Sequence, residues 1–212
     1  MNSIFPVWKP AGITSYDVIR KLKTVYKGVK IGHCGTLDPF AEGVLVICTG
    51  KMTKSISGIV DCEKEYIFNM KFGKETDTLD CTGNVIRQKN TEIDINFFTE
   101  IIKNFKGEIE QRPPYFSALK INGIRLYEFA RKDIFINLKP RKINILDIKA
   151  LSFSKDEAEV YVKCTKGTYI RSLARDISYK LNTYAYIDKL KRISVGGYNK
   201  DLSKNLVDIV NG

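Results

Sequence analysis

Hydrophobic patterns of helical period and of strand period alternate along the whole chain, and this alternation limits the possible folds most strongly. Thr14 and Asp17 have the spacing of a capping box, and apolar residues then recur at helical spacing up to Gly28. Apolar and polar side chains alternate over 65–72, as in a half-buried strand. No repeat or Gly/Ser-rich linker separates these patterns. The 212 residues predict a mixed α/β fold of one large domain, or of one domain with a substantial insertion.

The late part of the chain predicts a helix with two different faces. Thr168 can cap its start, and the apolar residues of 170–181 recur at the spacing of a core-facing side. Arg171 and Arg175 then lie one turn apart on the other side, near the positive end of the helix dipole. An acidic side chain from another segment could be held there. The alternative is a pair of solvated arginines.

The charge is strongly positive and is concentrated in two segments. The net charge is +11 and the isoelectric point is about 9.3. Residues 103–142 hold ten Lys or Arg against four acids, and residues 161–200 hold nine against two. Tyrosine and phenylalanine are interleaved with these cations, which suits nucleic acid, because bases stack on rings and phosphates bind cations. We therefore expect a nucleic-acid partner; a highly charged protein without one is the alternative.

Within the first basic segment, residues 112–141 lack a long periodic pattern. Pro113-Pro114 interrupts the backbone, Asn122-Gly123 predicts a turn, and only 126–130 has a helical pattern. We expect an excursion from the core that grips a ligand. The alternative is a connection with no binding role.

A loop bounded by glycine and proline carries the chain's one histidine and an aspartate. Residues 32–39 read Gly-His-Cys-Gly-Thr-Leu-Asp-Pro and precede the apolar run 44–48. The proline restricts the backbone of Asp38 to extended conformations. Asp38 and His33 are therefore candidate site residues. The alternative is ordinary turn chemistry around an Asp-Pro pair, with a histidine that is hydrogen-bonded for structural reasons.

The residues do not supply the usual ligands of a structural metal. The five cysteines are widely spaced without a Cys-x-x-Cys pair, and there is no second histidine to complete a zinc set. A Rossmann fingerprint and a phosphate-binding Gly-Lys-Ser/Thr loop are also missing from the sequence. No eighteen apolar residues run together, and the first ten residues do not resemble a leader. We expect no metal, no cofactor, no membrane association and a cytoplasmic protein.

Six ordered motifs of the chain resemble those of the TruB family of RNA pseudouridine synthases, which isomerise a uridine in the T arm of transfer RNA. The resemblance covers about residues 5–198. Each motif alone is weakly specific, whereas six in register are strongly specific. In chain order they are Lys9–Ser15, Gly32–Pro39, Tyr66, Gly73–Asp80, Tyr115–Lys120 and Lys166–Arg171.

The resemblance implies an α/β (α+β) pseudouridine synthase fold, in which helices flank a mostly antiparallel central sheet and the active site lies in a cleft across it. Residues 1–212 would form a single catalytic domain, with 112–141 as the thumb-like insertion that closes on RNA. Many family members continue into a further RNA-binding domain of the PUA type, whereas this chain stops at Gly212. We therefore expect RNA binding to depend on the thumb and the two basic segments.

The same resemblance assigns three catalytic residues. Asp38 is the catalytic carboxylate, either as a nucleophile or as a base at the ribose. Arg171 resembles the partner of Asp38, because a nearby cation keeps an acid ionised and a guanidinium can grip a carboxylate in two bonds. Tyr66 corresponds to the tyrosine that stacks on the uracil and is considered for the proton transfer at C5. The isomerisation changes neither composition nor oxidation state, so it needs no cofactor or metal in principle.

Four further residues correspond to positions that contact the RNA. Asp80 and Tyr169 would bond to or pack around the extruded nucleotide, and Leu190 would line its apolar pocket. His33 would fill the space that the base leaves in the RNA. Extrusion is necessary because a base inside a folded loop cannot reach a carboxylate, and it costs roughly a few kcal/mol. Lys9 would support the site without acting in catalysis.

The sequence leaves two alternatives to an enzyme of the T arm. The same motifs permit a pseudouridine synthase that acts on another RNA, because they describe the chemistry better than the target. A non-catalytic RNA binder or folding helper could keep the fold, although it would not need Asp38, Tyr66 and Arg171 together. We expect the partner to be the T-arm stem-loop of tRNA and the protein to be a monomer.

Overall fold

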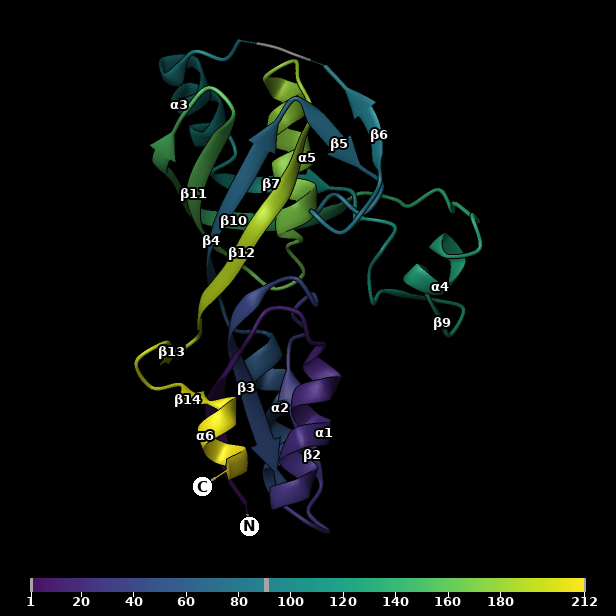
Figure 1. The fold of residues 1–212 in the computed structure, drawn as a ribbon, viewed down its shortest axis with the longest axis vertical. Coiled ribbons are helices and arrows are strands. Elements are labelled where there is room, and N and C mark those ends of the chain that lie inside the picture. Colours follow the sequence, from purple (N-terminus) through teal and green to yellow (C-terminus); the bar gives the residue numbers. More distant parts are fainter. Residues whose placement is uncertain (1, 90–91, 212) are drawn as a thin grey trace. The chain divides into compact units, whose positions relative to one another are not determined.

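The computed structural model describes residues 2–89 and 92–211, and its contacts divide the chain into two compact units (Figure 1). Each unit combines segments that are far apart in the sequence. The first unit comprises Met1–Ile67, Tyr161–Lys166 and Lys189–Gly212, and the second comprises Phe68–Val160 and Gly167–Asp188. Three strands contribute residues to both units: β4 (Lys64–Phe72), β11 (Glu157–Cys164) and β12 (Ala185–Val195).

The first unit is built around β3 (Glu42–Thr49), which is buried on both faces. Besides β3 and the shared strands, the unit contains β1 (Ile4–Lys9), α1 (Ser15–Val25), β2 (Ile31–Cys34), the 3-10 helix η1 (Gly50–Ser55), α2 (Ile56–Val60), β13 (Tyr198–Asn199), β14 (Lys204–Asn205) and α6 (Leu206–Asn211). In β3, Leu45 and Ile47 pack with α1 and α6, whereas Val44 and Val46 pack beside η1 and α2. The apolar run 44–48 is continuous because alternate side chains enter two different cores.

The start of α1 agrees with the sequence, whereas its end does not. The Thr14 side chain accepts a hydrogen bond from the Asp17 N–H, and the Asp17 side chain accepts one from the Thr14 N–H, which completes the predicted capping box. The helix ends at Val25, and the backbone N–H of Tyr26 caps it by donating to the Leu22 carbonyl. The predicted end at Gly28 was therefore late, and that glycine lies in the following turn.

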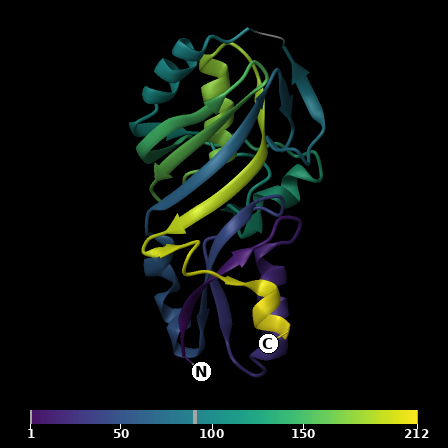
Figure 2. The same ribbon diagram turned by 60° about the vertical axis from the view of Figure 1, so that its left-hand side comes forward.

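The second unit holds the remaining elements, in which helices pack against long strands. They are β5 (Lys74–Thr76), β6 (Val85–Gln88), α3 (Ile95–Lys103), β7 (Gly107–Gln111), β8 (Lys120–Ile121), β9 (Ile124–Arg125), α4 (Leu126–Ala130), β10 (Arg141–Phe153) and α5 (Ile170–Lys180). Phe98 of α3 packs against Phe72 and Phe153, with ring centroids 5.9 Å and 5.1 Å away. In both views α5 lies against one face of the strands of this unit (Figure 1 and Figure 2).

Residues 112–141 belong to the second unit and carry the predicted turn and short helix. Asn122 and Gly123 both have positive φ, +51° and +84°, as a two-residue turn requires, and they join β8 to β9. The short helix α4 follows at 126–130, where the sequence predicted it. Figure 1 shows α4 and β9 to one side of the long strands of this unit rather than among them. The turn at Asn122-Gly123 and the helix at 126–130 are confirmed. The assignment of 112–141 as an insertion that binds RNA stays a prediction.

The strands pair in a large, mostly antiparallel sheet. Hydrogen-bonded neighbours follow the order β14-β1-β3-β12-β4-β11-β10-β7, with β2 also on β3 and β13 also on β12. The pairs β1–β3, β2–β3, β7–β10 and β12–β13 are antiparallel, whereas β1–β14 and β3–β12 are parallel. This pairing, with helices beside it, confirms the predicted fold class.

Candidate active site

In the first unit, two buried cations hold the loop that carries Asp38. The loop joins β2 to β3, which begins at Glu42. The next residue, Gly43, has Lys9 of β1 opposite it on one side and Arg192 of β12 on the other. Lys9 is fully buried and Arg192 is 1% exposed. Burying a charged side chain is costly unless its N–H groups find acceptors, and here backbone carbonyls supply them.

Lys9 binds the loop on the C-terminal side of Asp38. Its Nζ donates to the carbonyls of Pro10 at 2.8 Å, Ile13 at 2.7 Å and Pro39 at 3.3 Å. Burial lowers the pKa of Lys9 to about 8, and the nearby Asp38 carboxylate partly opposes this shift. Lys9 therefore contacts the loop backbone, as expected of a supporting residue.

Arg192 binds the loop on the N-terminal side of Asp38. Its Nη2 donates to the Gly35 carbonyl at 3.0 Å and its Nη1 to the Thr36 carbonyl at 3.5 Å. Its Nε donates to the Val44 carbonyl at 2.8 Å, beyond the other end of the loop. Sequence reasoning missed this residue. The sequence did contain a signal for it. Arg192 lies two residues after Leu190 in the same strand, so both side chains point to the same, buried face.

Tyr66 belongs to the same environment as Asp38. Asp38 is half-buried and Tyr66 is buried. Ser15, the first residue of α1, holds the loop of Asp38, because its Oγ accepts a hydrogen bond from the Leu37 N–H at 2.9 Å. Burial raises the pKa of Tyr66; the negative charge of Asp38 adds to the rise and the positive charge of Arg192 opposes it. Asp38 and Tyr66 thus belong to the same unit, close enough for the carboxylate to act on the pKa of the phenol, which stays protonated at neutral pH. Their shared catalytic role stays a prediction.

His33 and Leu190 also lie in the first unit. His33 is half-buried in β2, opposite Ile47 of β3. Leu190 is a buried residue of β12. Their predicted contacts with RNA stay predictions.

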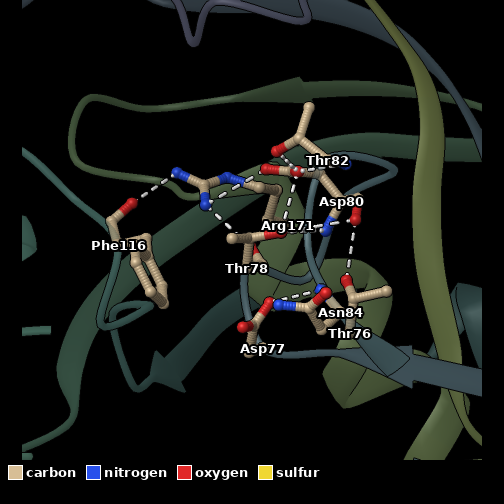
Figure 3. A network of polar contacts seen from close by, with 8 residues as sticks. All are labelled: Thr76, Asp77, Thr78, Asp80, Thr82, Asn84, Phe116 and Arg171. Atoms are coloured by element: carbon tan, nitrogen blue, oxygen red, sulfur yellow. Dashed lines mark hydrogen bonds and ion pairs between the residues drawn. The ribbon is translucent and has the colours of Figure 1, made fainter. Parts of the chain in front are cut away.

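In the second unit, Arg171 is buried and pairs with Asp80 (Figure 3). The Arg171 Nη1 lies 3.4 Å from Asp80 Oδ2, and the two side chains are 4% and 5% exposed. Nη1 also donates to the Thr78 carbonyl and Nη2 donates to the Phe116 carbonyl, each at 2.8 Å. One guanidinium therefore joins α5 to the loop after β5 and to the start of the excursion.

The Asp80 carboxylate is held by the loop around it (Figure 3). Its Oδ1 accepts hydrogen bonds from the Thr78 hydroxyl at 2.8 Å, the Thr82 hydroxyl at 2.5 Å and the Thr82 N–H at 3.0 Å. The Thr76 hydroxyl donates to the Asp80 carbonyl at 2.7 Å. These bonds fix the carboxylate with its other oxygen toward Arg171.

The helical pattern placed Arg171 and Arg175 away from the core-facing side, where an acidic side chain could be held, with two solvated arginines as the alternative. The structure agrees with the first interpretation for Arg171, because this residue is buried in α5 and pairs with Asp80. The N-cap is Tyr169 rather than Thr168, and its backbone is held by Gln111, which accepts the Tyr169 N–H at 2.8 Å. Asp38 and Arg171 belong to different units, so their pairing stays a prediction.

The residues at 2–89 and 92–211 contain no group of three or more His, Cys, Asp or Glu side chains arranged to hold a metal ion. A helix that crosses a bilayer needs about 20 mainly apolar residues, and within the same ranges no helix combines that length with that apolar character.

Comparison with known sequences identifies relatives over nearly the whole chain. The family described as "TruB family pseudouridylate synthase (N terminal domain)" matches residues 22–170. A tRNA pseudouridine synthase B of Clostridium acetobutylicum is 44% identical over 209 residues, which are 99% of this chain and 72% of that protein. The protein of the same name from Clostridium tetani is 45% identical over 210 residues, 99% of this chain and 73% of that protein.

Comparison with solved structures supports the fold. A chain of a Cbf5-Nop10-Gar1 complex superposes with a TM-score of 0.77 at 27% identity, over 98% of this chain and 53% of that one. A chain of an H/ACA RNP bound to a substrate RNA containing 2′-deoxyuridine gives a TM-score of 0.74 at 24% identity, over 98% of this chain and 52% of that one. The chain thus spans about half the length of these solved chains.

Proposed function

Because the chain belongs to the TruB family of pseudouridylate synthases, we propose that it isomerises uridine to pseudouridine in the T arm of transfer RNA. One observation carries the proposal: Asp38 sits half-buried on a loop whose two ends are bound by Lys9 and Arg192, beside the buried phenol of Tyr66. A carboxylate held in this way suits a reaction at a sugar carbon, because reacting groups must be positioned before the bond breaks.

The chemistry assigns a role to each residue of this group. The C–N glycosidic bond of uridine breaks and a C–C bond forms from C1′ to C5 of the same base. The C5 proton leaves to water and N1 takes up a proton, so the composition does not change. Asp38 acts at the ribose, as a nucleophile or as a base. Tyr66 is protonated and buried, so it can stack on the uracil without carrying a charge.

The second unit supports the proposal through residues that would hold the extruded nucleotide. Asp80 and Arg171 are fixed by hydrogen bonds on several sides, and Tyr169 caps α5 beside them. We propose that Arg171 serves as the cation for Asp38 and that Asp80 and Tyr169 bind the nucleotide. Leu190 would line its pocket, and His33 would replace the base in the RNA.

Release of tritium from a T-arm minihelix labelled at uridine C5 tests the proposal. We expect the wild-type protein to release the label into water and Asp38→Asn, which keeps the shape but not the charge, to release none. Binding of the minihelix by Asp38→Asn should stay within about threefold, since the loop backbone keeps its contacts. Release by Asp38→Asn would overturn the catalytic assignment.

The same assay separates the two alternatives. Labelled anticodon-arm and ribosomal RNA fragments should release no tritium if the T arm is the target, whereas release from one of them alone identifies another RNA. Tight binding of the T-arm minihelix without release by the wild-type protein would favour a folding helper. We also propose that the protein acts in the cytoplasm and that it is a monomer. Light scattering after size-exclusion chromatography tests the oligomeric state.

A further inference from the structure

Arg192 is a buried cation that the proposed roles leave unused. It is 1% exposed, and its guanidinium donates to three carbonyls, those of Gly35, Thr36 and Val44. These acceptors are 148 to 157 residues earlier in the sequence. An apolar side chain in place of Arg192 would leave these three carbonyls without their donor, which is costly. The guanidinium therefore does more than fill space in the core.

The acceptors lie at the two ends of one loop. Gly35 and Thr36 precede Asp38, and Val44 follows it in β3. A planar guanidinium with donors in a fixed fork joins these ends at a set separation, which a flexible ammonium does not do.

The backbone at Arg192 is itself fixed against the end of the loop. Arg192 is the strand partner of Gly43, and a Cβ built on that glycine would lie 2.2 Å from the Arg192 carbonyl oxygen. The close approach of the two strands thus leaves the guanidinium little freedom to move relative to the loop.

The second catalytic candidate lies on the neighbouring strand, because Tyr66 belongs to β4, which pairs with β12. Burial raises the pKa of the Tyr66 phenol, the positive charge of Arg192 opposes this rise, and the negative charge of Asp38 adds to it. Arg192 therefore binds the loop that carries Asp38 and acts electrostatically on Tyr66, and all three residues belong to the first unit.

We propose that Arg192 is a positioning residue that fixes the Asp38 loop relative to the Tyr66 hydroxyl. It acts through these two groups and does not touch the substrate. The inference rests on the proposed isomerase function, which it deepens.

The test compares Arg192→Lys with Lys204→Met. Arg192→Lys keeps the positive charge but removes the planar guanidinium, whereas Lys204→Met removes one charge from an exposed residue of β14 in the same unit, outside both basic segments. We expect Arg192→Lys to lower kcat for tritium release about 100-fold, the typical effect of misplacing a reacting group by about 1 Å. Its affinity for the minihelix and its KM should stay within about threefold, and Lys204→Met should keep the wild-type kcat.

A readout independent of catalysis is the ¹³Cζ resonance of Tyr66 in tyrosine-labelled protein, assigned by its loss in Tyr66→Phe. We expect it to shift in Arg192→Lys and not in Lys204→Met. An unchanged kcat, an unshifted resonance, or a loss of kcat that follows loss of folding or of RNA affinity would each overturn the positioning role. A wild-type protein that releases no tritium would instead contradict the proposed function, and the resonance would still decide whether Arg192 positions Tyr66.

Discussion

Lys9 and Arg192 bind backbone carbonyls on opposite sides of Asp38, and both lie opposite Gly43 in the strands that flank it. Two like charges are thus buried close together, which disfavours the charged form of Lys9. Their hydrogen bonds to the loop compensate part of this cost. The arrangement lowers the free energy of unfolding, and it holds the backbone at the candidate catalytic carboxylate in one conformation.

The lowered pKa of Lys9 predicts a pH-dependent stability. Burial lowers this pKa from 10.5 to about 8, so between these values the unfolded chain holds a proton that the folded chain has released. Stability rises with pH wherever the unfolded state binds more protons. The difference in free energy of unfolding between the wild type and Lys9→Met should therefore change by about 2 kcal/mol in favour of the wild type from pH 8 to pH 10.

Urea unfolding of both proteins at several pH values measures this difference, and the titrations that the two proteins share cancel. Below pH 7 the difference should be constant, because Lys9 is protonated in both states. A difference that stays constant from pH 8 to pH 10 would show that burial does not penalise this ammonium.

Gly43 should tolerate no side chain. A Cβ there would meet the Arg192 backbone, with its carbonyl oxygen at 2.2 Å and its nitrogen at 2.6 Å, and φ is +129°. Strands on both sides prevent the backbone from moving away, so we expect Gly43→Ala to lower the free energy of unfolding by at least about 3 kcal/mol.

Gly12→Ala is the matched control for Gly43→Ala, measured by the same urea unfolding. Gly12 also has positive φ, +88°, but a Cβ there has no atom within 4 Å. Its cost should be the backbone strain alone, about 1–2 kcal/mol. Equal losses in the two variants would show that strain, rather than the close approach of the strands, explains the glycine at 43.

The sequence predicted those features that depend on neighbouring residues. Thr14 and Asp17 cap α1 as their spacing indicated, and Asn122-Gly123 makes the turn expected in the excursion. Helix ends were less predictable, because the backbone of Tyr26 closes α1 before Gly28 is reached. Asp38 was identified as a candidate from its loop and from the family motifs.

The features that escaped prediction depend on contacts over long sequence distances. The helical pattern could not name the partners of Arg171, because its carbonyl acceptors at Thr78 and Phe116 lie 93 and 55 residues away. Helical period describes one face of a helix, and it does not report what covers the other face. Arg192 escaped notice for the same reason, since its loop acceptors lie about 150 residues earlier.

The buried pair of Asp80 and Arg171 should contribute much more to stability than an exposed pair. Asp80→Ala leaves a guanidinium that is 4% exposed without its carboxylate, so we expect the free energy of unfolding to fall by about 3–5 kcal/mol. Asp80→Asn should lose less, because its amide oxygen still accepts from Thr78 and Thr82. The control is Glu108→Ala, whose partner Lys142 lies 2.8 Å away in a pair that is 63% and 70% exposed. That pair should contribute at most about 1 kcal/mol. Urea unfolding followed by circular dichroism measures all three variants; similar losses for Asp80→Ala and Glu108→Ala would contradict the buried role of the pair.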